Sequence, residues 1–323
     1  MLSKQDNALL VTSEANTVMG NYLRCYWHPV ALSEEVAKPD SPPIRIKIMG
    51  EDLLLFRDSE GKTGLIEPFC AHRGADLFFG RNEECGIRCV YHGWKYDIYG
   101  NCIDMPNVPK DAAYHGKIKI KAYPTREFAD MVWAYMGPEN EEPSELPQLE
   151  VGLVPRNHRY VTKRLVECNW THSMEGALDT AHFSFLHMPA PSFTKDDSTN
   201  IAADEKRIRW LRNDPAPRFS IIEHAVGFMI GGARNADPGD HYWRLTQFML
   251  PTHSITPSAM PNETYYGYTW VPIDDHHCWT YVYAWNPDQP IPADELQKYK
   301  IGGYGQFAEL GPGYVPIRNR SNN

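Results

Sequence analysis

The chain has 323 residues, of which 42% are apolar, and this length suffices for two domains that each bury a core. Its formal charge of −9 argues against a nucleic acid partner, because phosphate binding needs clustered Lys and Arg that the sequence lacks. The longest apolar runs, such as Leu53 to Phe56, are too short to span a bilayer, and residues 1–20 lack the pattern of a secretion signal. We therefore expect a soluble, cytoplasmic protein that binds neither nucleic acid nor membrane.

The N-terminal part of the chain predicts a small β domain. Short alternating strands are expected at Ile44 to Ile48, Asp52 to Arg57 and Gly64 to Glu67, with glycine and aspartate turn signals between them. The stretch Gly137 to Pro155 carries four prolines and five glutamates, which is typical of an exposed connection between domains. We place the boundary there, between a domain at 1–140 and a domain at 141–323.

The second half of the chain predicts a helix packed on an antiparallel sheet. The helix is expected at roughly Cys168 to Leu186. Strand-like runs follow at Arg207 to Leu211, His241 to Leu250, Thr264 to Val271 and Cys278 to Trp285. The expected fold class is α+β.

Two cysteines and two histidines form the first set of candidate metal ligands. Cys70 and His72 are one residue apart, and Cys89 and His92 follow after sixteen intervening residues. Two such pairs describe a metal site, and ligand count alone fits either structural zinc or a two-iron, two-sulfur cluster with both histidines on one iron. Seven cysteines without a secretion signal do not suggest a disulfide framework.

Asp179, His182 and His187 form the second set. On a regular helix Asp179 and His182 share a face, whereas His187 is rotated away from His182 by roughly 140°. Both histidines can bind one metal only if the helix ends or bulges between them, and the prolines that follow predict an end near Leu186. Two histidines and a carboxylate form the facial triad of non-haem Fe(II) enzymes, which leaves one face open for O₂ and substrate. Histidines that only make hydrogen bonds in a core remain the alternative.

The residues around both sets resemble one enzyme family. Cys70-Ala-His72-Arg-Gly and Cys89-Val-Tyr-His92-Gly-Trp resemble the paired Rieske motifs of ring-hydroxylating oxygenases. The stretch Asn169 to His187 resembles their mononuclear-iron helix, so the similarity covers most of the chain. The subgroup that it resembles most is that of the phthalate dioxygenase-like enzymes.

Respiratory Rieske proteins add a cysteine to each loop, and these positions hold Ala75 and Tyr91 in this chain. The resemblance is therefore to the oxygenase kind, which suits a reducing cytoplasm.

The resemblance implies an N-terminal all-β Rieske domain and a catalytic domain with an antiparallel sheet flanked by helices. The first ligand set would hold a 2Fe-2S cluster, and His182 and His187 would ligate Fe(II). The family is trimeric, so the cluster of one subunit would lie near the iron of its neighbour. Asp179 would link the two centres by accepting hydrogen bonds from His182 and, across the interface, from His92.

The third iron ligand of the family is a carboxylate on a C-terminal helix. Asp294, Glu295 and Glu309 are acidic residues near the end of this chain, but their surroundings do not match that ligand segment. We therefore leave the third ligand unassigned and expect a chain that lacks the C-terminal part of the catalytic domain.

The substrate expected from the resemblance is an aromatic carboxylic acid. Arg207, Arg209 and Arg244 lie in strand-like runs of the second domain, where a solvated outer face is the common fate of arginine. We predict Arg207 and Arg244 as the carboxylate anchors, because a guanidinium pairs with a carboxylate through two hydrogen bonds.

An NADH-dependent reductase is an expected partner, because no glycine-rich dinucleotide fingerprint follows any predicted strand. A homotrimer, or a multiple of trimers, is the expected assembly. The predicted activity is cis-dihydroxylation of an aromatic acid such as phthalate with O₂. The alternatives are a Rieske monooxygenase or O-demethylase, a Rieske electron carrier, and a zinc-stabilised binding module.

Overall fold

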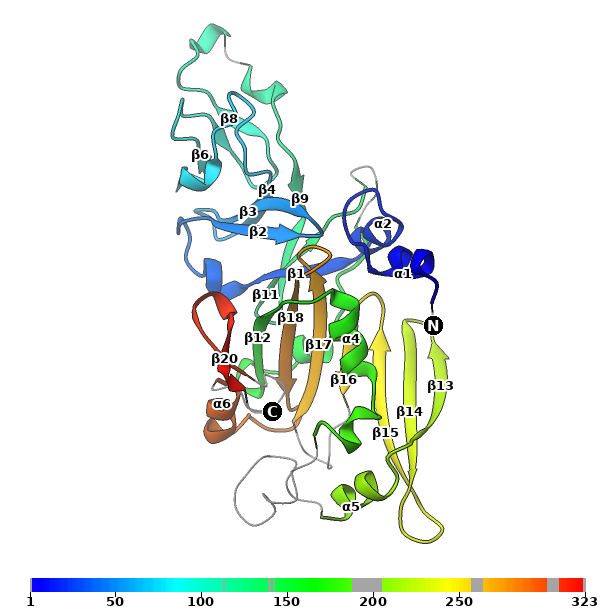
Figure 1. Cartoon of the computed structure of the whole chain (residues 1–323). Helices are drawn as coiled ribbons and strands as arrows, with labels where there is room; N and C mark the ends of the chain where they lie inside the picture. Colours follow the sequence, from blue (N-terminus) through cyan, green and yellow to red (C-terminus); the bar gives the residue numbers. More distant parts are fainter. Residues whose placement is uncertain are drawn as a thin grey trace. The chain divides into compact units, whose positions relative to one another are not determined.

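The computed structural model describes residues 2–112, 114–138, 141, 143–187, 205–256, 264–300 and 308–321. The chain divides into two compact units. The first comprises Met1–Leu153 with Val271–Cys278, and the second comprises Val154–Trp270 with Trp279–Asn323. Each unit has sheets of its own (Figure 1), and the predicted α+β class is confirmed.

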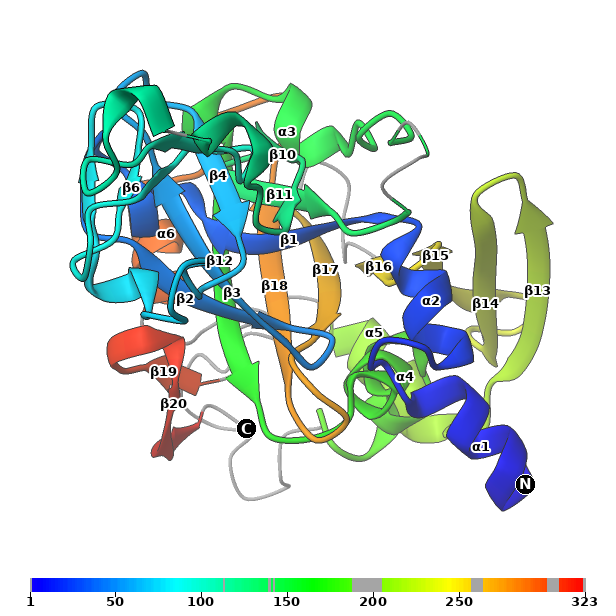
Figure 2. The ribbon, with the colours of Figure 1, turned by 90° about the horizontal axis from the view of Figure 1, so that it is seen from above.

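Helices α1 (Lys4–Val11) and α2 (Val18–Arg24) begin the first unit, and two small sheets follow them. One sheet has the order β1-β11-β10, formed by Trp27–Leu32, Met131–Tyr135 and Thr125–Phe128. The other has the order β2-β3-β4-β9, formed by Ile44–Ile48, Glu51–Arg57, Thr63–Ile66 and Ala122–Tyr123 (Figure 2). The three strands that we predicted here are therefore confirmed, with bounds that differ by at most one residue.

The burial of these strands follows their sequence patterns. In β2 the isoleucines at 46 and 48 are buried and Arg45 and Lys47 are exposed, as period-two alternation requires of a half-buried strand. In β3 the continuous run Leu53 to Phe56 is buried on both faces.

A third sheet of the first unit carries the second pair of candidate ligands, Cys89 and His92, whereas Cys70 and His72 lie in the loop after β4. Its order is β5-β6-β7-β8, formed by Arg81–Glu83, Gly86–Arg88, Lys95–Tyr96 and Cys102–Asp104. Cys70 and Cys89 belong to the hydrophobic core under this sheet, together with Leu77, Ile87 and Trp94.

A seven-stranded sheet forms the second unit, and its pairings from β13 to β17 are antiparallel. The order is β12-β18-β17-β16-β15-β14-β13, formed by Arg159–Val166, Cys278–Trp285, Tyr265–Pro272, His253–Thr256, His241–Met249, Gly227–Asn235 and Arg218–His224. Along β15, Arg244 and Thr246 are buried and Trp243 and Leu245 are exposed, so only one face of this strand is covered.

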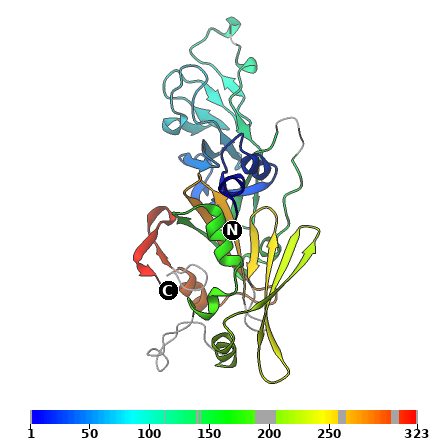
Figure 3. The ribbon, with the colours of Figure 1, turned by 45° about the vertical axis from the view of Figure 1, so that its right-hand side comes forward.

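Helices lie against this sheet (Figure 3). α4 (Trp170–Leu178) contacts β15 and β16, and α5 (Glu205–Asn213) contacts β14. The indole of Trp270 on β17 donates a hydrogen bond of 3.0 Å to the Ser173 hydroxyl of α4. The remaining elements are α3 (Glu150–Leu153), α6 (Ala293–Lys300) and the hairpin of β19 (Ala308–Leu310) with β20 (Pro316–Ser321).

Two predictions about secondary structure are wrong. The run Arg207 to Leu211 is helical, in α5, and the two buried residues at its ends are four apart, which is the spacing of one helix face. The helix predicted to reach Leu186 ends at Leu178, because Asp179 has extended backbone angles of φ −69° and ψ 135°. Its side chain accepts hydrogen bonds from the amides that follow, and this local pairing competes with helix continuation.

Within the residues that the structure describes, no helix is both long and apolar enough to cross a membrane.

An ion pair joins two sheets of the first unit. Arg57 of β3 donates both terminal nitrogens to the carboxylate of Glu127 on β10, at 2.7 and 2.6 Å. The hydrogen bonds from this arginine lower the pKa of Glu127. The pair therefore stabilises the fold above the unfolded-state pKa of glutamate, and this contribution is lost as the pH falls through the lower folded-state value.

We predict that Glu127→Gln lowers the free energy of unfolding by about 1 to 3 kcal/mol at neutral pH, because a charge-assisted pair with a largely buried guanidinium is lost. Urea unfolding at pH 7 measures the change. Glu60→Gln is the control, since it removes a pair with Lys62 whose side chains are both 60% exposed, and its urea midpoint should match the parent's. A parent-like midpoint for Glu127→Gln would show that the pair is energetically neutral.

Candidate functional site

The two loops that carry the first ligand set have the same backbone plan. In one loop the amide of Gly74 donates to the carbonyl of Cys70 at 2.9 Å, and in the other the amide of Gly93 donates to the carbonyl of Cys89 at 3.0 Å. Both glycines have positive φ, +65° and +79°, a conformation that side chains rarely adopt. Each loop therefore turns tightly behind its cysteine and presents the intervening histidine at its tip.

The four candidate ligands come together between the loops. Cys70 and Cys89 are buried, and the rings of His72 and His92 lie 4.6 Å apart between centroids. Burial raises the pKa of the Cys89 thiol, and Cys70 is close enough to raise this pKa further. The Nδ1 atom of His72 is buried and makes no hydrogen bond within the described structure, so it is available as a metal ligand. Two thiols and two imidazoles in this arrangement fit a 2Fe-2S cluster.

Neighbouring side chains hold these ligands. The hydroxyl of Tyr96 lies 3.2 Å from the sulfur of Cys70 and accepts a hydrogen bond of 3.1 Å from the Ala71 amide. The ring of Trp94 stacks on His72 at 4.5 Å with an angle of 10°, and its indole nitrogen donates to Asn107 at 2.8 Å. Trp94 thus orients the imidazole of His72, and the hydrogen bond to Asn107 fixes Trp94 in its turn.

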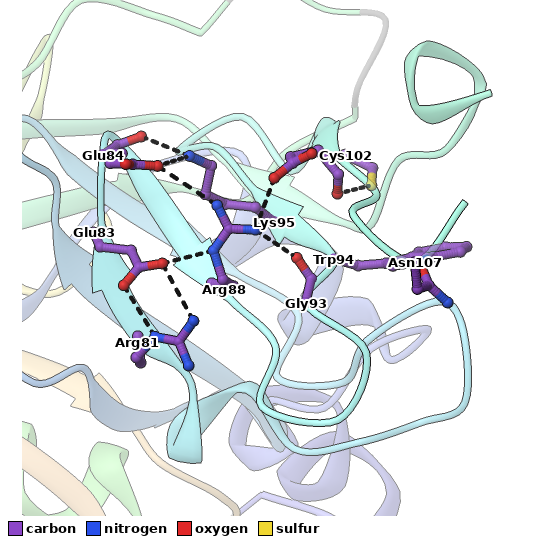
Figure 4. A network of polar contacts seen from close by, with 10 residues as sticks. Arg81, Glu83, Glu84, Arg88, Gly93, Trp94, Lys95, Cys102 and Asn107 are labelled. Atoms are coloured by element: carbon purple, nitrogen blue, oxygen red, sulfur yellow. Dashed lines mark hydrogen bonds and ion pairs between the residues drawn. The ribbon is translucent and has the colours of Figure 1, made fainter. Parts of the chain in front are cut away.

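A polar network around Arg88 holds the loop that carries Cys89 and His92 (Figure 4). Arg88, which precedes Cys89, donates to the carbonyl of Gly93 at 2.8 Å, to Asp104 at 2.8 Å and to Glu83 at 2.6 Å. These partners lie on β8, on β5 and in the loop itself. One guanidinium therefore ties the loop to both outer strands of its sheet.

The second ligand set follows α4: Asp179 caps this helix, His182 begins the short helix η6 (His182–Ser184), and His187 lies just after η6. Asp179 accepts hydrogen bonds from the amides of Ala181 and His182, at 2.8 and 3.0 Å, and its carboxylate is 3.1 Å from Nδ1 of His182. The chain turns sharply at this point, so the rings of His182 and His187 are only 5.0 Å apart between centroids. The turn therefore brings together two histidines that a continuous helix would have pointed in different directions.

The protonation of this set suits a metal site. Burial lowers the pKa of His187 to about 4, with further contributions from His182 and Arg244, so this imidazole is neutral at physiological pH. Burial alone would raise the pKa of Asp179, but the hydrogen bonds from the two amides and from His182 outweigh it and lower that pKa. A neutral imidazole and an ionised carboxylate are the forms that bind or orient a cation.

Three buried arginines gather beside the histidines. Arg207 and Arg244 are 8% exposed and Arg234 is 0% exposed. The guanidinium of Arg244 lies over the ring of Phe183 at 3.8 Å, and Arg207 is close enough to lower the pKa of Arg244, behind the larger effect of burial. None of the three forms an ion pair with a carboxylate within the described part of the chain, and the Nε atom of each is buried without a hydrogen bond there.

The structure therefore brings both predicted anchors, Arg207 and Arg244, to one place, although the first lies on a helix. Arg209 points elsewhere, since it is exposed and pairs with Asp237 at 2.9 Å.

A third iron ligand is not among the residues placed here. Across the described ranges, no three His, Cys, Asp or Glu side chains already converge as a complete metal site. Asp294 and Glu295 lie in the first turn of α6, where Glu295 accepts a hydrogen bond from Tyr299, and Glu309 lies on β19.

Sequence reasoning missed four side chains of these sites. Tyr96 follows the second cysteine by seven residues, so its hydroxyl contact to the first loop could have been sought. Phe183, Arg234 and Tyr242 had no such signal, because only the fold brings their strands and turn together.

Comparison with known families places both halves of the chain. A family described as the Rieske 2Fe-2S domain matches residues 13–124, and one described as LigXa C-terminal domain like matches residues 134–323. The chain is 38% identical to a phthalate 4,5-dioxygenase oxygenase subunit of Pseudomonas putida, over 100% of this chain and 73% of that protein. It is 35% identical to a 3-chlorobenzoate-3,4-dioxygenase oxygenase subunit of Comamonas testosteroni, over 96% of this chain and 74% of that protein.

More distant likenesses agree. A 5,5'-dehydrodivanillate O-demethylase oxygenase subunit of Sphingobium is 33% identical over 85% of this chain and 61% of its own length. Among solved structures, dicamba monooxygenase bound to 3,6-dichlorosalicylic acid superposes with a TM-score of 0.65 over 87% of this chain and 84% of that one, and its 17% identity supports the fold alone.

The ligand loops, the histidine turn and these matches confirm the resemblance and the predicted Rieske 2Fe-2S cluster, and a mononuclear non-haem iron is the second cofactor of this family. They leave no place for the zinc-stabilised module or the simple electron carrier. This chain belongs to the Rieske non-haem iron ring-hydroxylating oxygenases, as an oxygenase subunit of their phthalate dioxygenase-like subgroup.

Proposed function

We propose that this oxygenase cis-dihydroxylates an aromatic carboxylic acid, such as phthalate, with O₂ and with electrons that a separate reductase draws from NADH. The observation that carries the proposal is the pair of buried arginines, Arg207 and Arg244, beside the two histidines of the turn. Relatives that are named for phthalate and chlorobenzoate support an acid as substrate.

In this proposal His182 and His187 ligate the mononuclear iron, and Cys70, His72, Cys89 and His92 ligate the cluster. The short distance between the two rings of each histidine pair supports both assignments. The cluster stores electrons and the iron provides the open face at which O₂ reacts with the substrate. The third iron ligand stays unassigned.

Asp179 would connect the two centres between neighbouring subunits. Its carboxylate already contacts the His182 ring, and its side chain is 41% exposed, so one edge remains accessible to a partner's imidazole. A carboxylate held by two backbone amides keeps its orientation, as an electron path from His92 of one subunit to His182 of the next requires.

The two arginines would bind the acid through their unpaired edges. The guanidinium of Arg244 is oriented by Phe183 on its face and by the Tyr242 hydroxyl at 3.5 Å, which leaves Nε without a partner in the described structure. Two cations that repel each other in a buried site are best neutralised by two negative charges, so a dicarboxylate is favoured over a monocarboxylate. The ring of the acid would then be held next to the histidines.

The proposal also includes the domain organisation, the redox partner and the cellular compartment. Residues 1–140 would serve as the Rieske domain and 141–323 as the catalytic domain, in a homotrimer or a multiple of trimers that works with an NADH-dependent reductase. None of the seven cysteines forms a disulfide in the described structure, which supports a reducing cytoplasm. Monooxygenation or O-demethylation is the second candidate reaction, which the O-demethylase relative favours, and product analysis with a labelled O₂ separates it from dihydroxylation.

We predict that His182→Ala abolishes product formation and leaves the visible spectrum of the cluster unchanged, because the two metal sites share no ligand. Metal analysis and low-temperature EPR of the dithionite-reduced protein measure the iron in each site. Loss of cluster absorption in this variant would contradict the separation of the sites.

We predict that Arg244→Leu weakens binding of phthalate by roughly 30-fold to 3000-fold, because removing one partner of a buried charged pair costs roughly 2 to 5 kcal/mol. Titration of the reduced, anaerobic protein with phthalate measures the affinity. Arg209→Leu is the matched control, since that arginine is exposed, and it should bind phthalate like the parent. If Arg244→Leu keeps the parent affinity, this residue is not in the pocket.

We predict that Tyr96→Phe lowers the reduction potential of the cluster, because a hydrogen bond to a ligand sulfur stabilises the more negative, reduced state. A redox titration followed by EPR gives the potential. Tyr99→Phe, at an exposed tyrosine nearby, should not change it. An unchanged potential in Tyr96→Phe would mean that the hydroxyl does not donate to the sulfur.

A further inference from the structure

The segment that carries His182 is a single turn of 3-10 helix, η6, and needs support from elsewhere. Asp179 closes it on one side by accepting hydrogen bonds from its amides. The opposite side, formed by Thr180 and Ser184, is buried and faces strand β14 of the sheet. The residues of β14 that contact Thr180 and Ser184 therefore determine the orientation of the His182 ring.

Arg234 on β14 grips both ends of this turn. Its Nη2 donates to the carbonyl of Thr180 at 2.6 Å and reaches the hydroxyl of Ser184 at 3.5 Å, while Nη1 reaches the Thr180 hydroxyl at 3.5 Å. These two residues lie immediately on either side of the segment that contains His182. The guanidinium therefore fixes the turn by its backbone and by its side chains.

A glycine on the same strand makes room for the turn. Gly232 lies two residues before Arg234 and so on the same face of β14. A Cβ atom at this position would lie 2.4 Å from Cγ2 of Thr180, closer than real contacts allow. Thr180 thus packs against the backbone of β14 at Gly232 and is hydrogen-bonded by Arg234 of the same strand.

The burial of Arg234 distinguishes it from a filler of the core. Its side chain is fully buried and forms no ion pair in the described ranges. Burial and the charge of Arg244 lower its pKa, and the charges of Asp214 and Asp179 offset this only in part. Burying a cation in this way is unfavourable, and an apolar residue would fill the same volume at lower cost. Both of its terminal nitrogens are hydrogen-bonded to the turn, whereas Arg244 makes its hydrogen bond to the Tyr242 hydroxyl and none to the turn in the described structure.

We propose that Arg234 is a positioning residue that sets the direction of the His182 ring toward the mononuclear iron, while Arg207 and Arg244 bind the substrate. The inference rests on the proposed function in that it takes His182 and His187 as iron ligands. It assigns one of three neighbouring arginines to the metal site and the other two to the acid.

The test is the affinity of the mononuclear site for Fe(II) in the whole protein. That iron is removed with a chelator and titrated back, and the visible absorption of the cluster reports that the first unit is intact. Phthalate affinity and the midpoint of thermal unfolding are measured for the same samples. The variants are Arg234→Met, Arg234→Lys and Gly232→Ala, with Arg209→Met as the matched control in the same region of the fold.

We expect Arg234→Met to weaken Fe(II) binding by about 10-fold to 100-fold, the usual effect of losing a residue that orients a metal ligand. Arg234→Lys should recover part of the affinity, since an ammonium can still donate to the Thr180 carbonyl. Gly232→Ala should weaken Fe(II) binding from the other side, by pushing Thr180 away. Arg209→Met should match the parent.

Parent-like Fe(II) affinity in Arg234→Met would overturn the proposal, and so would a variant that binds iron normally but loses phthalate, since Arg234 would then belong to the substrate site. If Arg234→Met does not fold, parent-like iron affinity in both Arg234→Lys and Gly232→Ala overturns the proposal instead. His182→Ala distinguishes failure of the proposed iron-ligand assignment from failure of the proposed role of Arg234. Iron retained there contradicts the ligand assignment, whereas iron lost there and kept in Arg234→Met contradicts only the role of Arg234.

Discussion

Both metal sites depend on one constraint, which is that their ligands cannot be brought together by regular secondary structure. A cysteine and a histidine two residues apart share a face only on a strand, and a pair three apart shares one only on a helix. Histidines five apart share a face on neither, so no regular element serves all three pairs. The chain meets this constraint with short closed turns. Glycines with positive φ close the two cluster loops, and the carboxylate of Asp179 ends α4 and closes the histidine turn.

Such turns must be anchored to a rigid part of the fold, and in both units an arginine anchors the turn to a sheet. Arg88 ties the second cluster loop to β5 and β8, and Arg234 ties the histidine turn to β14. The guanidinium suits the task because its donors leave in several fixed directions and can reach backbone carbonyls and side chains together. The difference lies in charge balance, since Arg88 forms ion pairs with Glu83 and Asp104, whereas Arg234 forms no ion pair in the described ranges.

Much of this could be predicted from the sequence where the signal is local. The alternation of Ile44 to Ile48 and the pairing of Cys70 with His72 are each contained in a few residues, and the strand and the ligand loop are found as predicted. The end of α4 was placed too late because the capping by Asp179 was not recognised. Arg234 lies far along the chain from Thr180, so no pattern within one segment could have linked them.

The segment from Asp179 to His187 joins the two tasks of the catalytic site. Phe183 lies between the two histidines in sequence, its ring is 4.7 Å from that of His187, and the guanidinium of Arg244 covers it at 3.8 Å. Any movement of Arg244 toward a bound carboxylate must therefore be accommodated by a side chain that also contacts an iron-site histidine. Because interiors are close-packed, that contact cannot be loosened without a shift of its neighbours. Under the proposed assignment of Arg244 to the substrate and of His187 to the iron, substrate binding and the geometry of the iron site would thus be linked through the ring of Phe183.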